Sequence, residues 1–224
     1  MEKQYLLFDL DGTLTDPMEG ITRSVQYALD HYGIHEPDQK KLCPFIGPPL
    51  KECFIKYYGF EDEKAAEAVT VFREYFSARG IFENQVYAGI PEMLSLLKES
   101  GKTLLVATSK PERFAKQILE HFKLEGYFTF VGGADMTETR VKKGDVIRYV
   151  MEEAGISDPS QAMMIGDREH DVLGAKENSM DSVGVLFGYG SRQELEEAGA
   201  TVIAATVEEL GRILMGETEG GQPW

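Results

Sequence analysis

The segment LLFDLDGTLTD, residues 6–16, puts two aspartates directly behind an apolar run near the N-terminus. The run QYLLF, residues 4–8, is short and rich in leucine and aromatic residues, which predicts a buried β-strand. The carboxyl end of a strand in a parallel sheet borders the crevice where ligands bind. Two carboxylates there, Asp9 and Asp11, repel each other unless a cation or a shared proton compensates. A structural Asp-Gly turn after a strand would account for the same residues. This segment alone therefore leaves open both a ligand-binding aspartate pair and a simple turn.

The charge balance limits the partners of the protein. The 224 residues carry 23 Lys and Arg against 38 Asp and Glu, a net charge of −15. No run of basic residues interrupts this acidic character, so we expect no binding to nucleic acid or to anionic membranes. A hydrophobic fraction of 42% and a mean hydropathy of −0.27 are typical of a globular protein.

The cysteines and apolar runs indicate the expected cellular compartment of the protein. Cys43 and Cys53 lack metal-ligand spacing, and we read both as reduced thiols. The N-terminus has no signal-peptide core, and no apolar run reaches the length of a membrane span. We therefore expect a soluble cytoplasmic protein; the sequence leaves a monomer and a small homo-oligomer both open.

From about residue 87, strand and helix patterns alternate regularly. Strands are expected at KTLLVAT (102–108), YFTFVGG (127–133), QAMMIGD (161–167), DSVGVLF (181–187) and TVIAAT (201–206). Amphipathic segments lie between them, such as KPERFAKQILEHF (110–122). Alternation of this kind implies right-handed crossovers and a parallel sheet. We predict a Rossmann-like, three-layer α/β core made of residues 1–16 and 85–224.

Residues 17–84 break this alternation. Helical spacing recurs in GITRSVQYALDHYG (20–33), PLKECFIKYYG (49–59) and EKAAEAVTVFREYFSARG (63–80), and no strand is expected. We predict an inserted helical domain over residues 17–84.

Three more polar segments stand at strand ends or at the start of the following helix. They are TSK (108–110), KKGD (142–145) and GDREHD (166–171). Because the carboxyl ends of parallel strands share one edge, these groups can meet the first aspartate pair in one crevice. Together they supply carboxylates, a hydroxyl with loop amides, and a lysine, a set that suits a phosphate group and a divalent cation.

In this order the segments resemble the motifs of the haloacid dehalogenase (HAD) superfamily. Its pattern is DxDGT, a Thr or Ser ending the second core strand, a Lys, and an acidic GD motif; here these stand at Asp9, Thr108, Lys143 and Gly166. The helical insert matches the C1 cap of that superfamily. FDLDGTLTD, GIPEMLSLLKESG and GDREHDVLGA are similar to the phosphoglycolate phosphatase-like subgroup.

The resemblance implies roles for the carboxylates. Asp9 is the nucleophile that forms an aspartyl-phosphate, and Asp11 protonates the leaving oxygen and then activates water. Mg²⁺ is bound by Asp9, the backbone carbonyl of Asp11, and Asp167. Asp171 either supports the metal shell or Lys143, or is itself a ligand.

The resemblance also implies a phosphate-binding set. The Thr108 hydroxyl, the Ser109 amide and Lys143 bind phosphate, while Gly12 and Thr13 turn the chain tightly below it. Ser109 stays open as the hydroxyl donor in place of Thr108. Many relatives have prolines and an aspartate after the lysine, whereas Gly144-Asp145 follows here, so Lys142 stays open as the alternative to Lys143.

These roles imply a Mg²⁺-dependent phosphatase of a small phosphorylated metabolite, such as phosphoglycolate, a nucleotide or a sugar phosphate. A phosphomutase of the β-phosphoglucomutase kind and a non-catalytic binding protein on the same scaffold are the alternatives. Specificity in this superfamily resides largely in the cap, which carries no readable code here. Residues 45–50, FIGPPL, are either a substrate-contacting loop or a bend between helices, and Arg23 or Lys51 are surface residues or contacts to a substrate carboxylate.

Overall fold

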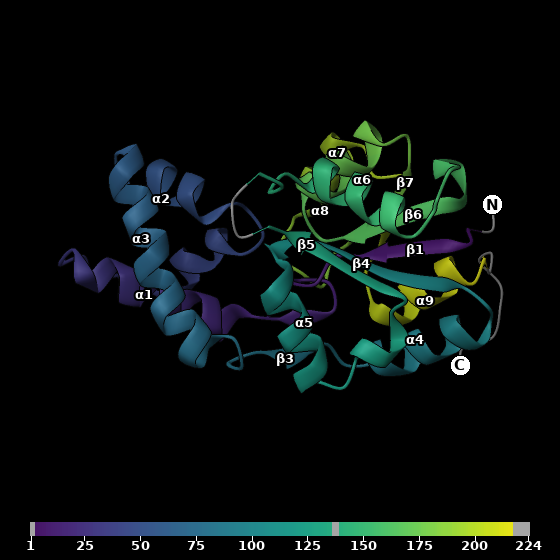
Figure 1. Ribbon diagram of the computed structural model, residues 1–224, viewed down its shortest axis with the longest axis horizontal. Coiled ribbons are helices and arrows are strands. Elements are labelled where there is room, and N and C mark those ends of the chain that lie inside the picture. The colour runs from purple at the N-terminus through teal and green to yellow at the C-terminus, as the bar shows by residue number, and fades with distance from the viewer. Residues whose placement is uncertain (1–2, 136–138, 217–224) are drawn as a thin grey trace. The chain divides into compact units, whose positions relative to one another are not determined.

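The computed structural model describes residues 3–135 and 139–216. The chain divides into two compact units (Figure 1). One comprises the residues up to Leu14 and those from Val86 onward, and the other comprises Thr15–Gln85.

The first unit is built on a parallel six-stranded sheet with the order β5-β4-β1-β6-β7-β8. Its strands are β1 (Tyr5–Phe8), β4 (Thr103–Pro111), β5 (Phe130–Ala134), β6 (Ala162–Gly166), β7 (Asp181–Val185) and β8 (Val202–Ala204). The last residue of β1, Phe8, pairs with Val106 of β4 and Ile165 of β6. The sheet grows in opposite directions on the two sides of β1, so the end of β1 lies where open α/β sheets bind ligands.

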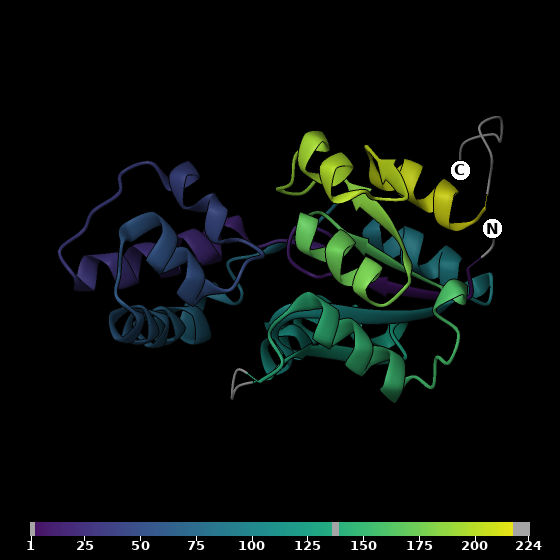
Figure 2. The ribbon, with the colours of Figure 1, turned by 90° about the horizontal axis from the view of Figure 1, so that it is seen from above.

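Helices cover both faces of this sheet. They are α4 (Ile90–Glu99), α5 (Glu112–His121), α6 (Lys143–Glu153), α7 (Glu169–Glu177), α8 (Arg192–Ala198) and α9 (Val207–Leu214). Figure 1 shows α6 and α7 on one face and α4 and α9 on the other, and Figure 2 shows the yellow C-terminal elements along one edge. Leu7, Leu105 and Met164 of the strands pack against Val146 and Val150 of α6 in one buried cluster. The predicted three-layer α/β core is confirmed.

The second unit is mainly helical. It contains α1 (Met18–His31), the 3₁₀ segment η1 (Gln39–Phe45), α2 (Leu50–Tyr58), α3 (Asp62–Tyr75) and the π-helical turn η2 (Phe76–Gly80). Its core is aromatic: the ring of Phe54 stacks on Phe60 and meets Phe45 edge to face. The sequence did not indicate η1 or the short strands β2 (Thr15–Asp16) and β3 (Gln85–Val86). None of the three segments is long enough for a periodic pattern to be recognised.

One predicted boundary is wrong in a way that affects the site. The sequence placed Lys110 at the start of a helix, but β4 continues to Pro111 and α5 begins at Glu112. A residue that precedes proline is disfavoured in helical conformation, so Lys110 stays extended. The strand register also shifts between Thr108 and Pro111. This backbone carries the Lys110 side chain toward the end of β1.

Among the described residues, no helix has both the length and the apolar character needed to cross a membrane.

Candidate active site

The two aspartates of the opening motif stand directly behind β1 and are almost completely buried, with 5% of Asp9 and 7% of Asp11 exposed. The Asp9 amide donates to the carbonyl of Ile165 in β6 at 2.8 Å, which extends the strand pairing to Asp9. Leu10 donates its amide to Asp9 Oδ1 at 2.7 Å. The backbone around Asp9 is therefore fixed by the sheet.

Gly12 is required by a close approach. Its φ is +84°, and a Cβ on it would lie 2.3 Å from Asp167 Oδ2. Thr13 follows with its amide bonded to the Leu10 carbonyl, and its hydroxyl donates to Asp167 Oδ1 at 3.4 Å. The expected tight turn is present, and it lies against Asp167.

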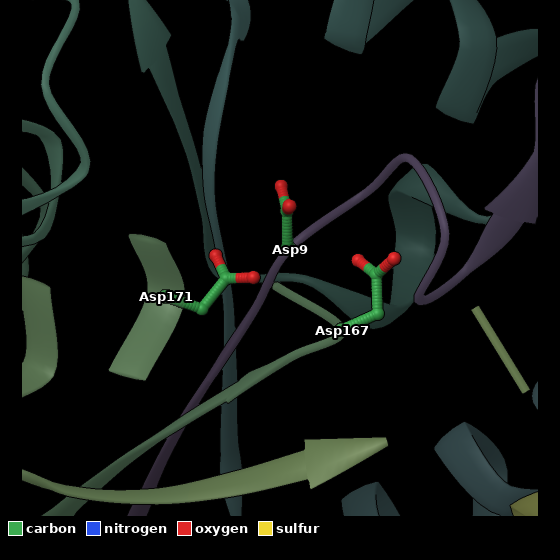
Figure 3. Close-up of side chains that lie close together, drawn as sticks. All are labelled: Asp9, Asp167 and Asp171. Atoms are coloured by element: carbon green, nitrogen blue, oxygen red, sulfur yellow. The ribbon is translucent and has the colours of Figure 1, made fainter. Parts of the chain in front are cut away.

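Three buried carboxylates gather at this turn: Asp9, Asp167 and Asp171 (Figure 3). Each offers an oxygen within 4.8 Å of the others. Asp167 follows β6, and Asp171 lies in the first turn of α7, where its Oδ2 accepts from the Arg168 amide at 3.1 Å. Burial, together with the nearby Asp171 and Asp9 carboxylates, raises the pKa of Asp167 well above its usual value.

Lys143, the first residue of α6, joins the same cluster. Its Nζ lies 2.9 Å from Asp9 Oδ1 and 2.8 Å from Asp171 Oδ1, and it donates to the Ala107 carbonyl at 3.0 Å. Burial alone would lower the pKa of Lys143, but the Asp171 and Asp9 carboxylates raise it to about 12. The neighbouring Lys142 is exposed, so the structure brings Lys143 rather than Lys142 to the carboxylates.

Sequence reasoning missed a second lysine. Lys110 Nζ lies 2.5 Å from Asp11 Oδ2, and both side chains are buried. Burial raises the pKa of Asp11, and the Lys110 ammonium offsets part of that rise. The signal that could have revealed Lys110 is the proline that follows it, because a residue before proline disfavours helical backbone and the helix then begins later.

The donor set fits a divalent cation. Lys110 pairs with Asp11, and Lys143 pairs with Asp9 and Asp171. With Asp167 added and all four carboxyl groups ionised, the formal charge of the site would be 2 − 4 = −2. Buried carboxylates without compensation are costly, and hard carboxylate oxygens are the ligands that Mg²⁺ prefers. The Asp9, Asp167 and Asp171 cluster is where such an ion would bind.

Thr108 and Ser109 lie near the end of β4. Thr108 is 2% exposed and its Oγ1 accepts from the Lys110 amide at 3.2 Å, whereas Ser109 is half-buried. Their assignment to a phosphate stays a prediction.

The loop after β7 is a further part of the site that the sequence did not reveal. The Tyr189 amide donates to Asp167 Oδ2 at 2.8 Å. A Cβ on Gly188 would lie 2.3 Å from the Gly12 carbonyl oxygen and 2.4 Å from Asp167 Cβ. The pair of glycines flanking Tyr189 at a strand end was the available signal for such a close backbone approach.

The candidate specificity residues of the helical unit are engaged within that unit. Arg23 pairs with Glu83 at 2.7 Å and with Glu19 at 2.6 Å, and Lys51 pairs with Asp62 at 2.8 Å. Residues 46–49 connect η1 to α2. A substrate contact by the FIGPPL segment stays a prediction.

Known proteins resemble this chain over most of its length. The profile of the haloacid dehalogenase-like hydrolases matches residues 6–185. A 5′-nucleotidase of Pseudomonas aeruginosa is 47% identical over 209 residues, which cover 93% of this chain and 94% of that protein. The tyrosine-protein kinase PtkA of Mycobacterium tuberculosis is 38% identical over 94% of this chain and 72% of its own.

A more distant relative and a solved structure complete the comparison. Phosphoglycolate phosphatase 1 of Pseudomonas aeruginosa is 29% identical over 92% of this chain and 77% of that protein. The crystal structure of a predicted phosphatase from Clostridium acetobutylicum superimposes with a TM-score of 0.94 at 50% identity, covering 96% of this chain and 100% of that one. The chain therefore belongs to the haloacid dehalogenase-like hydrolase family and is a phosphatase of that family.

Proposed function

We propose that the protein is a Mg²⁺-dependent phosphatase that hydrolyses a phosphomonoester of a small metabolite through an aspartyl-phosphate on Asp9. The observation that carries this proposal is the state of the Asp9 carboxylate. Among the described residues, its polar contacts, from Leu10 and Lys143, both fall on Oδ1. Oδ2 remains available to attack phosphorus, and carboxylates do serve as covalent nucleophiles.

The neighbouring residues would transfer protons, bind the phosphate oxygens and hold the metal ion. Asp11 protonates the leaving oxygen as the phosphorus–oxygen bond breaks, and then takes a proton from the water that hydrolyses the aspartyl-phosphate. Lys143 holds the Asp9 carboxylate, and the Thr108 hydroxyl and Ser109 amide bind phosphate oxygens. Mg²⁺, held by Asp9, Asp167 and the Asp11 carbonyl, with Asp171 beside them, would neutralise the charge of the phosphoryl group.

The substrate proposed is a small, soluble phosphate ester. The relatives named 5′-nucleotidase and phosphoglycolate phosphatase support nucleoside monophosphates and phosphoglycolate as the first compounds to test, beside sugar phosphates. The net charge of −15 supports the absence of a nucleic-acid or membrane partner. We propose a cytoplasmic location and a monomer or small homo-oligomer.

The direct test is phosphate release from a panel of these esters, with Mg²⁺ and with excess chelator. We expect release only when Mg²⁺ is present. Equal release in chelator would contradict the metal dependence, and transfer of the phosphoryl group to a second sugar hydroxyl without release would favour a phosphomutase.

Gly188 offers a test of the metal-binding residues. In a Gly188→Ala variant the new methyl group must displace Asp167 or the Gly12 carbonyl, because both lie within 2.4 Å of it. Residues that orient metal ligands usually contribute about tenfold or more to metal affinity, so we expect the apparent Mg²⁺ affinity to fall by about tenfold. A Mg²⁺ titration of the initial rate measures this. Gly126→Ala is the control, since a Cβ there meets nothing within 4 Å; equal affinities in both variants would argue against the role of the loop.

We further propose that residues 17–84 form a C1-type cap that governs substrate choice. Its insertion directly after the nucleophile motif and its helical composition support this role. Cap closure in such enzymes excludes water and brings further groups to the substrate. Hinges are proposed near Asp16-Pro17 and residues 87–91, where few residues need to change conformation.

Lys51 allows a matched test of the cap. Lys51→Ala and Asp62→Ala both break the same ion pair, but only the first removes a cation that could meet an anionic substrate. We expect Lys51→Ala to change the ratio of kcat/KM between two natural-type substrates by roughly tenfold. Asp62→Ala should leave that ratio unchanged. Equal effects of the two variants on every substrate would count against a specificity role for Lys51.

A further inference from the structure

Lys110 and Asp11 form a buried ion pair beside the carboxylate cluster. Lys110 Nζ is 2.5 Å from Asp11 Oδ2, and only 6% and 9% of the two side chains are exposed. Lys110 reaches this position from the end of β4, in the extended backbone that precedes Pro111. The contact joins residues 99 positions apart in the chain, so it depends on the sheet.

The two oxygens of the Asp11 carboxylate differ. Oδ2 accepts from Lys110, whereas Oδ1 is buried and has no hydrogen-bond partner among the described residues. A buried polar atom without a hydrogen-bond partner is unfavourable and uncommon in native proteins, whether it would donate or accept. Asp11 Oδ1 lies beside Asp9 without a partner in the described part of the chain, which indicates that its hydrogen-bond partner arrives with the substrate.

We propose that Lys110 is a positioning residue, which holds Oδ2 of Asp11 so that Oδ1 is the oxygen that exchanges protons with the reacting groups. The inference rests on the proposed function. In the first step Asp9 Oδ2 bonds to phosphorus, the bond from phosphorus to the leaving oxygen breaks, and the proton on Oδ1 passes to that oxygen. In the second step water bonds to phosphorus, the Asp9–phosphorus bond breaks, and Oδ1 takes the proton that the water loses. The products are the alcohol and inorganic phosphate, and both aspartates return to their starting state.

Fixing one oxygen matters because a proton is transferred only within hydrogen-bonding reach. A carboxylate rotates about its Cβ–Cγ bond unless a partner holds it. Lys143 does not provide this hold, because its contacts are to Asp9, Asp171 and the Ala107 carbonyl. Lys110 is the ammonium that bonds to Asp11 in the described part of the chain.

The test exploits the leaving group. A p-nitrophenolate leaves readily without a proton, whereas an alkoxide needs one, so positioning of Asp11 should matter mainly for alkyl esters. In a Lys110→Met variant we expect kcat/KM for an alkyl phosphate to fall by about 10- to 100-fold, and that for p-nitrophenyl phosphate by less than about threefold. Lys116→Met is the control, since Lys116 is exposed and pairs with Glu112; it should change neither value.

A double-mutant cycle makes the inference falsifiable even if Lys110→Met folds poorly. The Asp11→Asn/Lys110→Met variant has no buried unpaired carboxylate at position 11 and should match Asp11→Asn alone on the alkyl ester, within about twofold. The inference would be overturned if the activity losses of the two single variants multiplied in the double variant, or if Lys110→Met lost equal activity on both esters. Either result would show that Lys110 acts on the phosphate instead, and the proposed phosphatase function would stand. Absence of phosphate release from either ester in the wild type would overturn both.

Discussion

The Asp9→Asn variant should lose at least about 10⁴-fold in kcat while keeping its fold, a loss in the range found when catalytic nucleophiles are removed. An amide is a far poorer nucleophile than a carboxylate and a weaker metal ligand. The fold should survive because the Asn side-chain oxygen can still accept from the Leu10 amide and from Lys143, as Asp9 Oδ1 does. Steady-state phosphate release and thermal denaturation, measured on the same preparations, test the two halves of this result.

A second readout identifies the intermediate directly. Rapid acid quenching of the wild type with substrate should trap a phosphorylated peptide that contains Asp9, and the variant should show none. Asp30→Asn, an exposed carboxylate in α1, is the matched control and should change neither rate nor trapping. If Asp9→Asn kept more than about a tenth of the wild-type rate, the aspartyl-phosphate mechanism would be wrong.

The sequence predicted the part of the site that depends on strand ends. A buried apolar run fixes β1, so the position of Asp9 at the carboxyl edge followed from the parallel sheet alone. The same rule brought Asp167 to that edge, because β6 pairs directly with β1. Lys143 was expected to join them, and the structure brings its ammonium within 2.9 Å of Asp9.

The sequence could not predict contacts that depend on local backbone direction or tertiary approach. Lys110 fits the periodic pattern of residues 110–122, and the preference of a residue before proline for an extended backbone was the stronger influence. Gly188 touches Gly12 and Asp167 across the fold, and no periodicity encodes such a contact. Choosing Lys143 over Lys142 likewise required knowing which face of α6 meets the sheet.

Replacing Asp167 by Asn should stabilise the metal-free protein and abolish its response to Mg²⁺. Asp167 is fully buried, and its raised pKa reflects burial and repulsion from Asp171 and Asp9. A carboxyl group with a folded-state pKa above its unfolded value lowers stability as the pH rises through that pKa. Asn carries no charge and keeps an acceptor for the Tyr189 amide, so we expect a gain of about 1–3 kcal/mol in the free energy of unfolding near neutral pH. The gain should shrink as the pH falls below the raised pKa.

In the presence of Mg²⁺ the wild type should become more stable than Asp167→Asn. Ligand binding to the folded state raises stability, so Mg²⁺ should raise the Tm of the wild type and leave that of Asp167→Asn unchanged. Activity of the variant should fall by about 10³-fold or more, because the metal and its charge are lost from the phosphoryl group. Asp30→Asn should follow the wild type in each measurement. If Mg²⁺ stabilised Asp167→Asn as much as the wild type, the ion would bind elsewhere. If the variant were less stable than the wild type without Mg²⁺, the hydrogen bonds of the Asp167 carboxylate would outweigh its repulsion from Asp9 and Asp171.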